Sequence, residues 1–181
     1  MLRLFPNVNI KPCRAIRGMS AVLLPFTEDG KIRWNEFEAH LNRTFQNGLV
    51  PAVNMDTGFG NLLDDSSKRE VLQRTVTIAQ GRDFVAGVFI GDRAGDKLDL
   101  TAYLIRIEAV QEFGAIPILF PSYGVAASSD PELLSFFERI ARHAPRFLGF
   151  ELGTMFVPCG RIFSLKLFEE LLHVRECIGL K

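Results

Sequence analysis

The chain has 181 residues, of which 48% are hydrophobic and 23% are charged, so it has apolar material for a sizeable core and is not disordered by composition. Its 21 Lys and Arg balance its 21 Asp and Glu, and a formal net charge of zero provides no long-range attraction to nucleic acid or to an anionic membrane. The cysteines Cys13, Cys159 and Cys177 are widely spaced and form no CxxC pair. Neither a disulfide framework nor a structural zinc site is therefore expected.

No stretch of the sequence has the character of an export signal or a membrane span. The N-terminus is basic, but Pro6 and Lys11 interrupt it before a long apolar run develops. Elsewhere the apolar runs are far shorter than the roughly 20 residues needed to cross a bilayer. We therefore expect a cytoplasmic protein with reduced thiols, in which residues 1–18 form an N-terminal extension and residues 19–181 form one domain.

Two hydrophobic periods alternate along the chain. Short apolar runs closed by Pro or Gly are typical of strands buried on both faces, and apolar residues at helical spacing between them predict amphipathic helices. The expected strands are 20–24, 49–54, 83–90, 115–120, 147–152 and 177–181. The expected helices are 34–47, 65 to the residue before Gly81, 101–113, 129–141 with a capping Ser129, and 164–174.

Strands that alternate with helices imply a parallel sheet with helical crossovers, and two architectures fit. An open doubly wound sheet would be complete at this size, but it usually carries a glycine-rich phosphate turn that opens a helix. Gly58 and Gly60 form a GxG, yet residues 61–64 do not start a helix. The other architecture is the TIM barrel, which needs about 250 residues, so six strands would be about three quarters of one.

Polar and turn residues gather where the expected strands end, which is where barrel enzymes carry their sites. The order of these segments resembles that of the dihydrodipicolinate synthase and N-acetylneuraminate lyase family, which are Schiff-base lyases and aldolases on a TIM barrel. The matching segments are AVLLPF (21–26) with EDG (28–30), MDTG (55–58), FPSY (120–123) and IGLK (178–181). The resemblance covers residues 19–181 and ends at the lysine motif. It implies an α/β fold of the TIM (β/α)8 family, here an incomplete barrel of about six strands and five helices.

The resemblance assigns the Schiff-base lysine and the loop that holds the substrate. Lys181 matches the lysine, and a desolvated, neutral amine at a strand end can attack the carbonyl of a 2-oxo acid. Thr57 and Gly58 match the loop that binds the 2-oxo acid carboxylate. Asp56 belongs to the same loop but replaces a threonine, and its negative charge is unfavourable beside an anionic substrate.

The resemblance also assigns a tyrosine and an oligomeric state. Tyr123 matches one of two adjacent tyrosines of the family, and Ser122 replaces the other. In the family, the second tyrosine reaches the site of a neighbouring subunit. The full-length protein is therefore expected to be a homo-oligomer, either a dimer or a tetramer.

The fifth expected strand departs most from the family. Phe150 stands where the family has a tyrosine that moves protons, and Phe59 replaces a glutamate of the substrate loop. Glu151 follows Phe150 on an apolar strand, in surroundings that suit a general acid or base, so it is the expected substitute. Arg161, in the following loop, is a candidate to hold a substrate carboxylate.

These assignments predict a lyase or aldolase that forms a Schiff base between Lys181 and pyruvate or a related 2-oxo acid. No cofactor, metal, nucleic acid or membrane partner is expected. Two alternatives remain open: a metal-dependent or otherwise altered barrel enzyme that uses Asp56, Glu151 and Asp92, and a catalytically silent relative. The 181-residue chain itself is expected to have little or no lyase activity, because the carboxylate of a terminal Lys181 favours its ammonium form.

Overall fold

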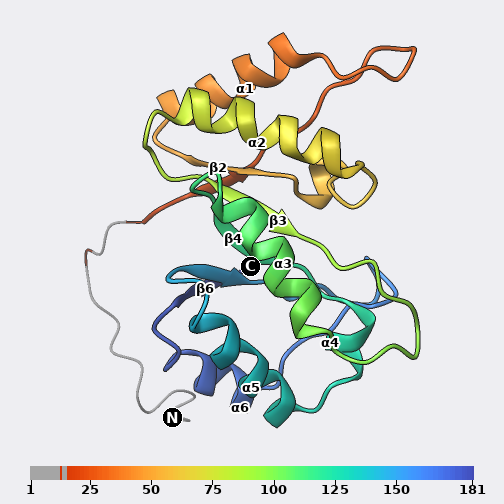
Figure 1. Cartoon of the computed structure of the whole chain (residues 1–181). Coiled ribbons are helices and arrows are strands. Elements are labelled where there is room, and N and C mark those ends of the chain that lie inside the picture. The colour runs from red at the N-terminus through yellow and green to blue at the C-terminus, as the bar shows by residue number, and fades with distance from the viewer. Residues whose placement is uncertain (1–12, 14–15) are drawn as a thin grey trace.

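The computed structural model describes residue 13 and residues 16–181 of the chain (Figure 1). Most of the predicted N-terminal extension, residues 1–18, lies outside the described residues. The division of the chain into residues 1–18 and 19–181 stays a prediction.

Six parallel strands form one sheet, in which the strands lie side by side in chain order. They are β1 (Met19–Ala21), β2 (Val50–Val53), β3 (Val85–Val88), β4 (Ile116–Leu119), β5 (Phe147–Gly149) and β6 (Cys177–Leu180). A doubly wound sheet would place β1 in the middle, so that alternative is wrong. Within the described residues, β1 and β6 are the two edges of an open arc, which confirms the predicted incomplete TIM barrel.

The helices surround the outer side of this arc, with α1 and α2 at one end of it, α3 in the middle and α5 and α6 at the other end (Figure 1). They are α1 (Trp34–Gln46), α2 (Asp65–Ala79), α3 (Leu100–Gln111), α4 (Tyr123–Ala127), α5 (Asp130–Ala141) and α6 (Leu165–Leu171). A capping box of Ser129 and Glu132 starts α5, as the sequence predicts. Among the described residues, no helix combines the length and apolar character that a membrane span requires.

Two short helices were not expected from the sequence. The five residues of α4 follow a Ser122 cap, and a 3-10 turn, η1, spans Asp56–Gly58. Both are too short to show an apolar period, so hydrophobic patterning does not reveal them. Both lie in segments that follow strands, and they therefore shape the end of the barrel at which a site is expected.

The arc has two apolar layers because its strands are buried on both faces. The larger layer lies between the sheet and the helices, and contains Val53, Phe147 and the helical Phe37 and Ile140. The inner layer lines the concave face of the arc. It consists of Ala52, Met55, Val85, Ile116, Ile118, Phe120, Leu148 and Phe150, with Ala21, Val50, Phe89 and Leu152 packed against them. Because side chains alternate along a strand, this register decides which strand-end residues face the interior.

Candidate functional site

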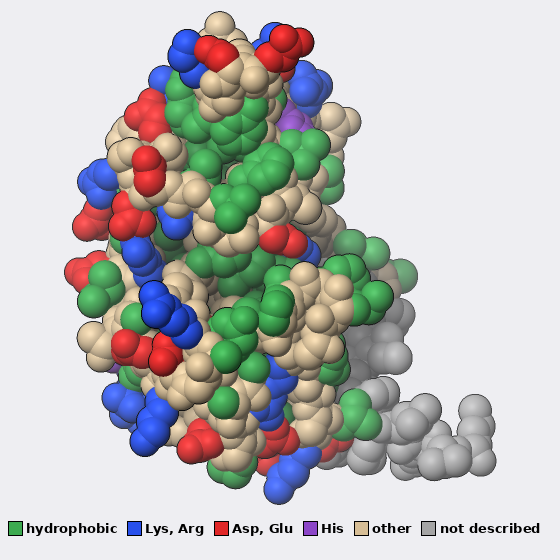
Figure 2. Space-filling view, turned by 90° about the vertical axis from the view of Figure 1, so that its right-hand side faces the viewer, with side chains coloured by type: hydrophobic (Ala, Val, Ile, Leu, Met, Phe, Trp, Pro, Cys, Tyr) green, Lys and Arg blue, Asp and Glu red, His purple; other side chains and the backbone are tan. Residues whose placement is uncertain are grey.

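The loops that follow the strands lie together on the right-hand side of Figure 1, which is the side that faces the viewer in Figure 2. On this face hydrophobic side chains are interspersed with charged ones (Figure 2). Phe26, after β1, and Phe59, after β2, are both part-exposed and meet edge to face with ring centroids 5.5 Å apart. The ends of neighbouring strands are thus brought together at one edge of the sheet, where barrel enzymes carry their chemistry.

The loop after β2 is held firmly at both ends. Asn54 is buried with a left-handed backbone (φ 50°), and its side-chain amide donates to the carbonyl oxygen of Lys68 on α2 at 3.1 Å. The backbone N–H groups of Gly58 and Gly60 both donate to the carbonyl oxygen of Met55. These two N–H groups are therefore satisfied inside the loop rather than directed at a ligand.

Lys181 directly follows β6 and is aligned by the sheet. Its backbone N–H donates to the carbonyl oxygen of Gly149 at 3.1 Å, and its own carbonyl oxygen accepts from the N–H of Glu151 at 2.8 Å. Its Nζ lies 4.0 Å from Oδ1 of Asp56 and 4.4 Å from the ring centroid of Phe150. The lysine and Asp56 side chains are 48% and 40% exposed, so solvent screens this ion pair and both groups remain open to exchange protons with water.

A cavity of about 240 Å³ lies along the concave face of the arc, beside Lys181. Among the described residues that line it, Lys181 and Arg17 are the charged ones. Arg17 is already paired with Asp83 at 2.7 Å. The other lining residues are Met19, Ala21, Ala52, Met55, Val85, Ile118, Leu148 and Leu180. This lining suits a small ligand with an apolar part and a polar group that reaches Lys181.

Glu151 does not face this cavity. Phe150 and Leu152 belong to the inner layer, so the intervening Glu151 projects to the outer side of the arc. There its Oε1 accepts a hydrogen bond of 2.5 Å from the N–H of Phe163, just before α6. Glu151 therefore stabilises the loop between β5 and α6, and the structure does not bring it to Lys181 as the predicted acid–base group.

Arg161 is also committed elsewhere. Its guanidinium pairs with Asp130 at 2.6 Å and donates to the carbonyl oxygens of Val125, Ala126 and Ser128 at the C-terminal end of α4. These are the carbonyl groups that a helix end leaves without partners. The structure thus gives Arg161 the role of joining α4 to the start of α5, instead of the predicted role of holding a substrate carboxylate.

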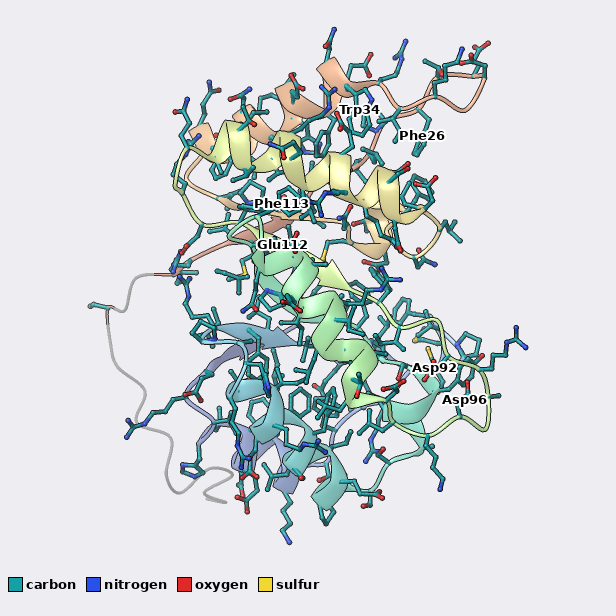
Figure 3. The ribbon with its side chains drawn as sticks, viewed as in Figure 1. Phe26, Trp34, Asp92, Asp96, Glu112 and Phe113 are labelled. Carbon is teal, nitrogen blue, oxygen red and sulfur yellow. The ribbon has the colours of Figure 1, made fainter. Side chains whose placement is uncertain are left out.

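Asp92, Ser122 and Tyr123 meet at the start of α4. The carboxylate of Asp92 accepts from the N–H groups of Tyr123 and Gly124 at 3.0 and 2.8 Å, and in Figure 3 Asp92 lies on the β3–α3 loop beside this helix. The Ser122 hydroxyl accepts from the N–H of Val125. The backbone of Tyr123 is thereby held at the start of α4, and its side chain is half-buried.

The carboxylates of the metal alternative are not assembled. Asp92 binds the start of α4, Glu151 binds the Phe163 amide, and Asp56 faces Lys181. In the part of the chain that the structure describes, no group of three or more His, Cys, Asp or Glu side chains is arranged to hold a metal ion. The predicted trio therefore does not form a centre.

Sequence reasoning missed the contact between Phe150 and Lys181. In the sequence Phe150 is only a departure from the family, whereas in the structure its ring lies against the ammonium group and in edge-to-face contact with Phe120. The remaining tyrosine, Tyr103, is fully buried and donates to the carbonyl oxygen of Phe120 at 2.8 Å. Burial raises the pKa of Tyr103 well above its ordinary value, so this phenol acts in the core.

No family model matches the chain. A curated 2-dehydro-3-deoxy-phosphogluconate/2-dehydro-3-deoxy-6-phosphogalactonate aldolase from Sulfurisphaera tokodaii is 26% identical over 132 residues, which are 72% of this chain and 42% of the aldolase.

Among solved structures, one similar protein is YagE from Escherichia coli K12, a prophage protein of the dihydrodipicolinic acid synthase family that was solved in complex with pyruvate. Its TM-score is 0.73 and its sequence identity is 16%, and the match covers 91% of this chain and 53% of YagE. A dihydrodipicolinate synthase from Agrobacterium tumefaciens has a TM-score of 0.72 and 20% sequence identity. The match covers 91% of this chain and 54% of the synthase. N-acetylneuraminate lyase from Mycoplasma synoviae has a TM-score of 0.62 and is 21% identical in sequence. The match covers 91% of this chain and 54% of the lyase. The chain thus spans about half the length of the proteins that it matches.

The class follows from the order of the strands and from the helices outside them: this chain has the fold of a TIM barrel over six consecutive strands and the helices that connect them. Within that class, the chain is similar to the dihydrodipicolinate synthase and N-acetylneuraminate lyase family, as its motifs predict.

Proposed function

We propose that this protein is a lyase or aldolase in which Lys181 forms a Schiff base with pyruvate or a related 2-oxo acid. The observation that carries the proposal is the place of Lys181: it follows the last strand of the arc, at the edge where the βα loops meet, and borders a small apolar cavity. An amine in such a position can add to a carbonyl group from the cavity side.

The names of the similar proteins support the same reaction class. The curated relative is an aldolase, and the YagE structure contains pyruvate. In this chain Thr57 and Gly58 lie directly after Asp56 on η1 and would border the carboxyl end of a bound 2-oxo acid. Tyr123, at the start of α4, would close the site from the side of β4.

The test is reductive trapping. The full-length protein is incubated with pyruvate and sodium cyanoborohydride over a series of pH values up to mildly alkaline, and the intact mass is measured. We expect one reduced pyruvate per chain in the wild-type protein and in Lys166→Arg, which removes an exposed lysine of α6. Lys181→Arg keeps the charge but cannot form an imine, so its adduct should be absent. Equal labelling of Lys181→Arg, or no labelling of the wild type at any pH, would refute the proposal.

A second candidate is a catalytically silent protein of this fold. The observation in its favour is that the ring beside Lys181 belongs to Phe150, which has no group that can transfer a proton. The same trapping experiment separates the two candidates, because a silent protein forms no adduct at Lys181.

We also propose that the protein is cytoplasmic and that its full-length form is a homo-oligomer. The cysteines Cys13, Cys159 and Cys177 are free thiols, which supports a reducing compartment. Size-exclusion chromatography with light scattering tests the oligomeric state.

A further inference from the structure

We propose that Asp56 is the proton-transfer group of this site, which donates a proton during imine formation and accepts one during enamine formation. This inference rests on the proposed Schiff-base role of Lys181. It gives Asp56 a catalytic role where its place in the loop predicts substrate binding.

The first argument is proximity. Oδ1 of Asp56 lies 4.0 Å from Nζ of Lys181, and Asp56 starts η1, which follows β2 in the chain. A proton donor must come within about 3 Å of the atom that it serves, or act through one water. A carbinolamine carbon bonded to Nζ on the side of Asp56 brings its hydroxyl within that reach of the carboxylate, because the C–N bond is only about 1.5 Å long. The side chain of Asp56 is 40% exposed, so it is in contact with solvent that can supply protons.

The second argument is that Phe150, Glu151 and Tyr103 cannot supply this proton. Phe150 contacts Lys181 but has no ionisable group. Glu151 projects outward to the N–H of Phe163, and Tyr103 is buried with its hydroxyl on a backbone carbonyl. Among the described residues, Asp56 is the acidic side chain that forms an ion pair with Lys181.

The carboxyl group of Asp56 can serve as both the acid and the base in the successive steps of the reaction. The Asp56 carboxylate first takes a proton from the Lys181 ammonium, which leaves a neutral amine and a protonated acid. The amine then adds to the carbonyl carbon as the C=O π pair moves to oxygen, and a proton moves from nitrogen to that oxygen to give a carbinolamine. Protonated Asp56 donates its proton to the carbinolamine hydroxyl as the C–O bond breaks, water leaves, and the nitrogen lone pair forms the C=N bond of an iminium ion. The Asp56 carboxylate next removes a proton from the methyl carbon beside the iminium. The C–H electron pair becomes the C=C bond of the enamine, the C=N π pair returns to nitrogen, and Asp56 is protonated again.

Two readouts separate the roles of the two residues. Trapping with cyanoborohydride reports the imine on Lys181. Exchange of the pyruvate methyl protons for deuterium, followed by proton NMR in deuterated buffer, reports enamine formation and therefore the base. Because positioned acid–base groups contribute typically 10²–10⁴-fold, we expect Asp56→Asn to lower the exchange rate about 100-fold while still reaching one trapped pyruvate per chain.

The controls address charge and structure. Asp29→Asn removes an exposed aspartate that pairs with Lys31 in the loop after β1, and it should leave exchange unchanged. Phe150→Tyr in the Asp56→Asn background places a phenol on the ring that contacts the ammonium, and it should restore part of the exchange rate. A merely structural effect of the Asp56 change would not be repaired in this way.

The outcomes distinguish the two proposals. If the wild type is trapped and exchanges methyl protons, and Asp56→Asn is trapped but exchanges at the wild-type rate, the role of Asp56 is refuted and that of Lys181 stands. If the wild type is neither trapped nor exchanges, the proposed function itself fails. If Asp56→Asn loses exchange and the tyrosine restores part of it, the inference is supported.

Discussion

Gly87, in the middle of β3, is the position at which the structure predicts the sharpest stability effect. A Cβ added there would overlap the backbone carbonyl oxygen of Asn54, would lie 3.0 Å from the carbonyl carbon of Asn54, and would lie 2.9 Å from Cε2 of Phe89. The obstacle at Asn54 cannot rotate aside, because it is backbone and because its side chain is tied to α2. Overpacking a core costs typically 1–3 kcal/mol, and a backbone obstacle belongs at the upper end, so we expect Gly87→Ala to lower the free energy of unfolding by about 3 kcal/mol.

The assay is urea unfolding followed by far-UV circular dichroism. Gly91→Ala is the matched control, because a Cβ on Gly91 meets nothing within 4 Å and its backbone is not left-handed. Its unfolding free energy should stay within about 0.5 kcal/mol of the wild type. Equal midpoints for Gly87→Ala and the wild type would show that β3 and the end of β2 are not packed as described.

Two further predictions concern the core and the dependence of stability on pH. Tyr103→Phe removes the donor to the buried carbonyl oxygen of Phe120, and should lower the unfolding free energy by about 1–2 kcal/mol in urea unfolding; no change would contradict this hydrogen bond. Hydrogen bonds from Arg146 and Arg17 lower the pKa of Asp83 to about 2. Because the folded-state pKa lies below the unfolded value of about 4, this stabilisation is present above pH 4 and is lost as the pH falls towards 2. Because solvent screens these part-exposed ion pairs, we expect Asp83→Asn to lower the free energy of unfolding by only about 1 kcal/mol at pH 7. The difference in unfolding free energy between wild type and variant should shrink on acidification, and a difference that does not change with pH would refute the assignment.

The long helices could be predicted from their apolar periods, and the strand order from the strand-end motifs that resemble a TIM-barrel family. Helix α1 was expected at 34–47 and spans Trp34–Gln46, and the predicted Ser129 cap starts α5. The short α4 and η1 could not be predicted, since they are set by single capping and turn residues rather than by a period.

The site could be predicted only in part. Lys181 was located by its motif at a strand end, but the direction of Glu151 was not, because β5 is apolar on both faces and its pattern does not say which face is concave. The partners of Arg161 lie about thirty positions earlier in the chain, at Ser128 and Asp130, and only the packed structure brings them together. Long-range pairing of this kind leaves no local signal in a sequence.

The most direct test of the central claim is a crystal structure of the protein after trapping with pyruvate and cyanoborohydride. We predict that the reduced pyruvate is attached to Nζ of Lys181, lies on the concave side of the arc between Asp56 and the ring of Phe150, and has its carboxylate directed towards Thr57. A pyruvate bound to another lysine, or directed to the outer side of the sheet, would contradict the account.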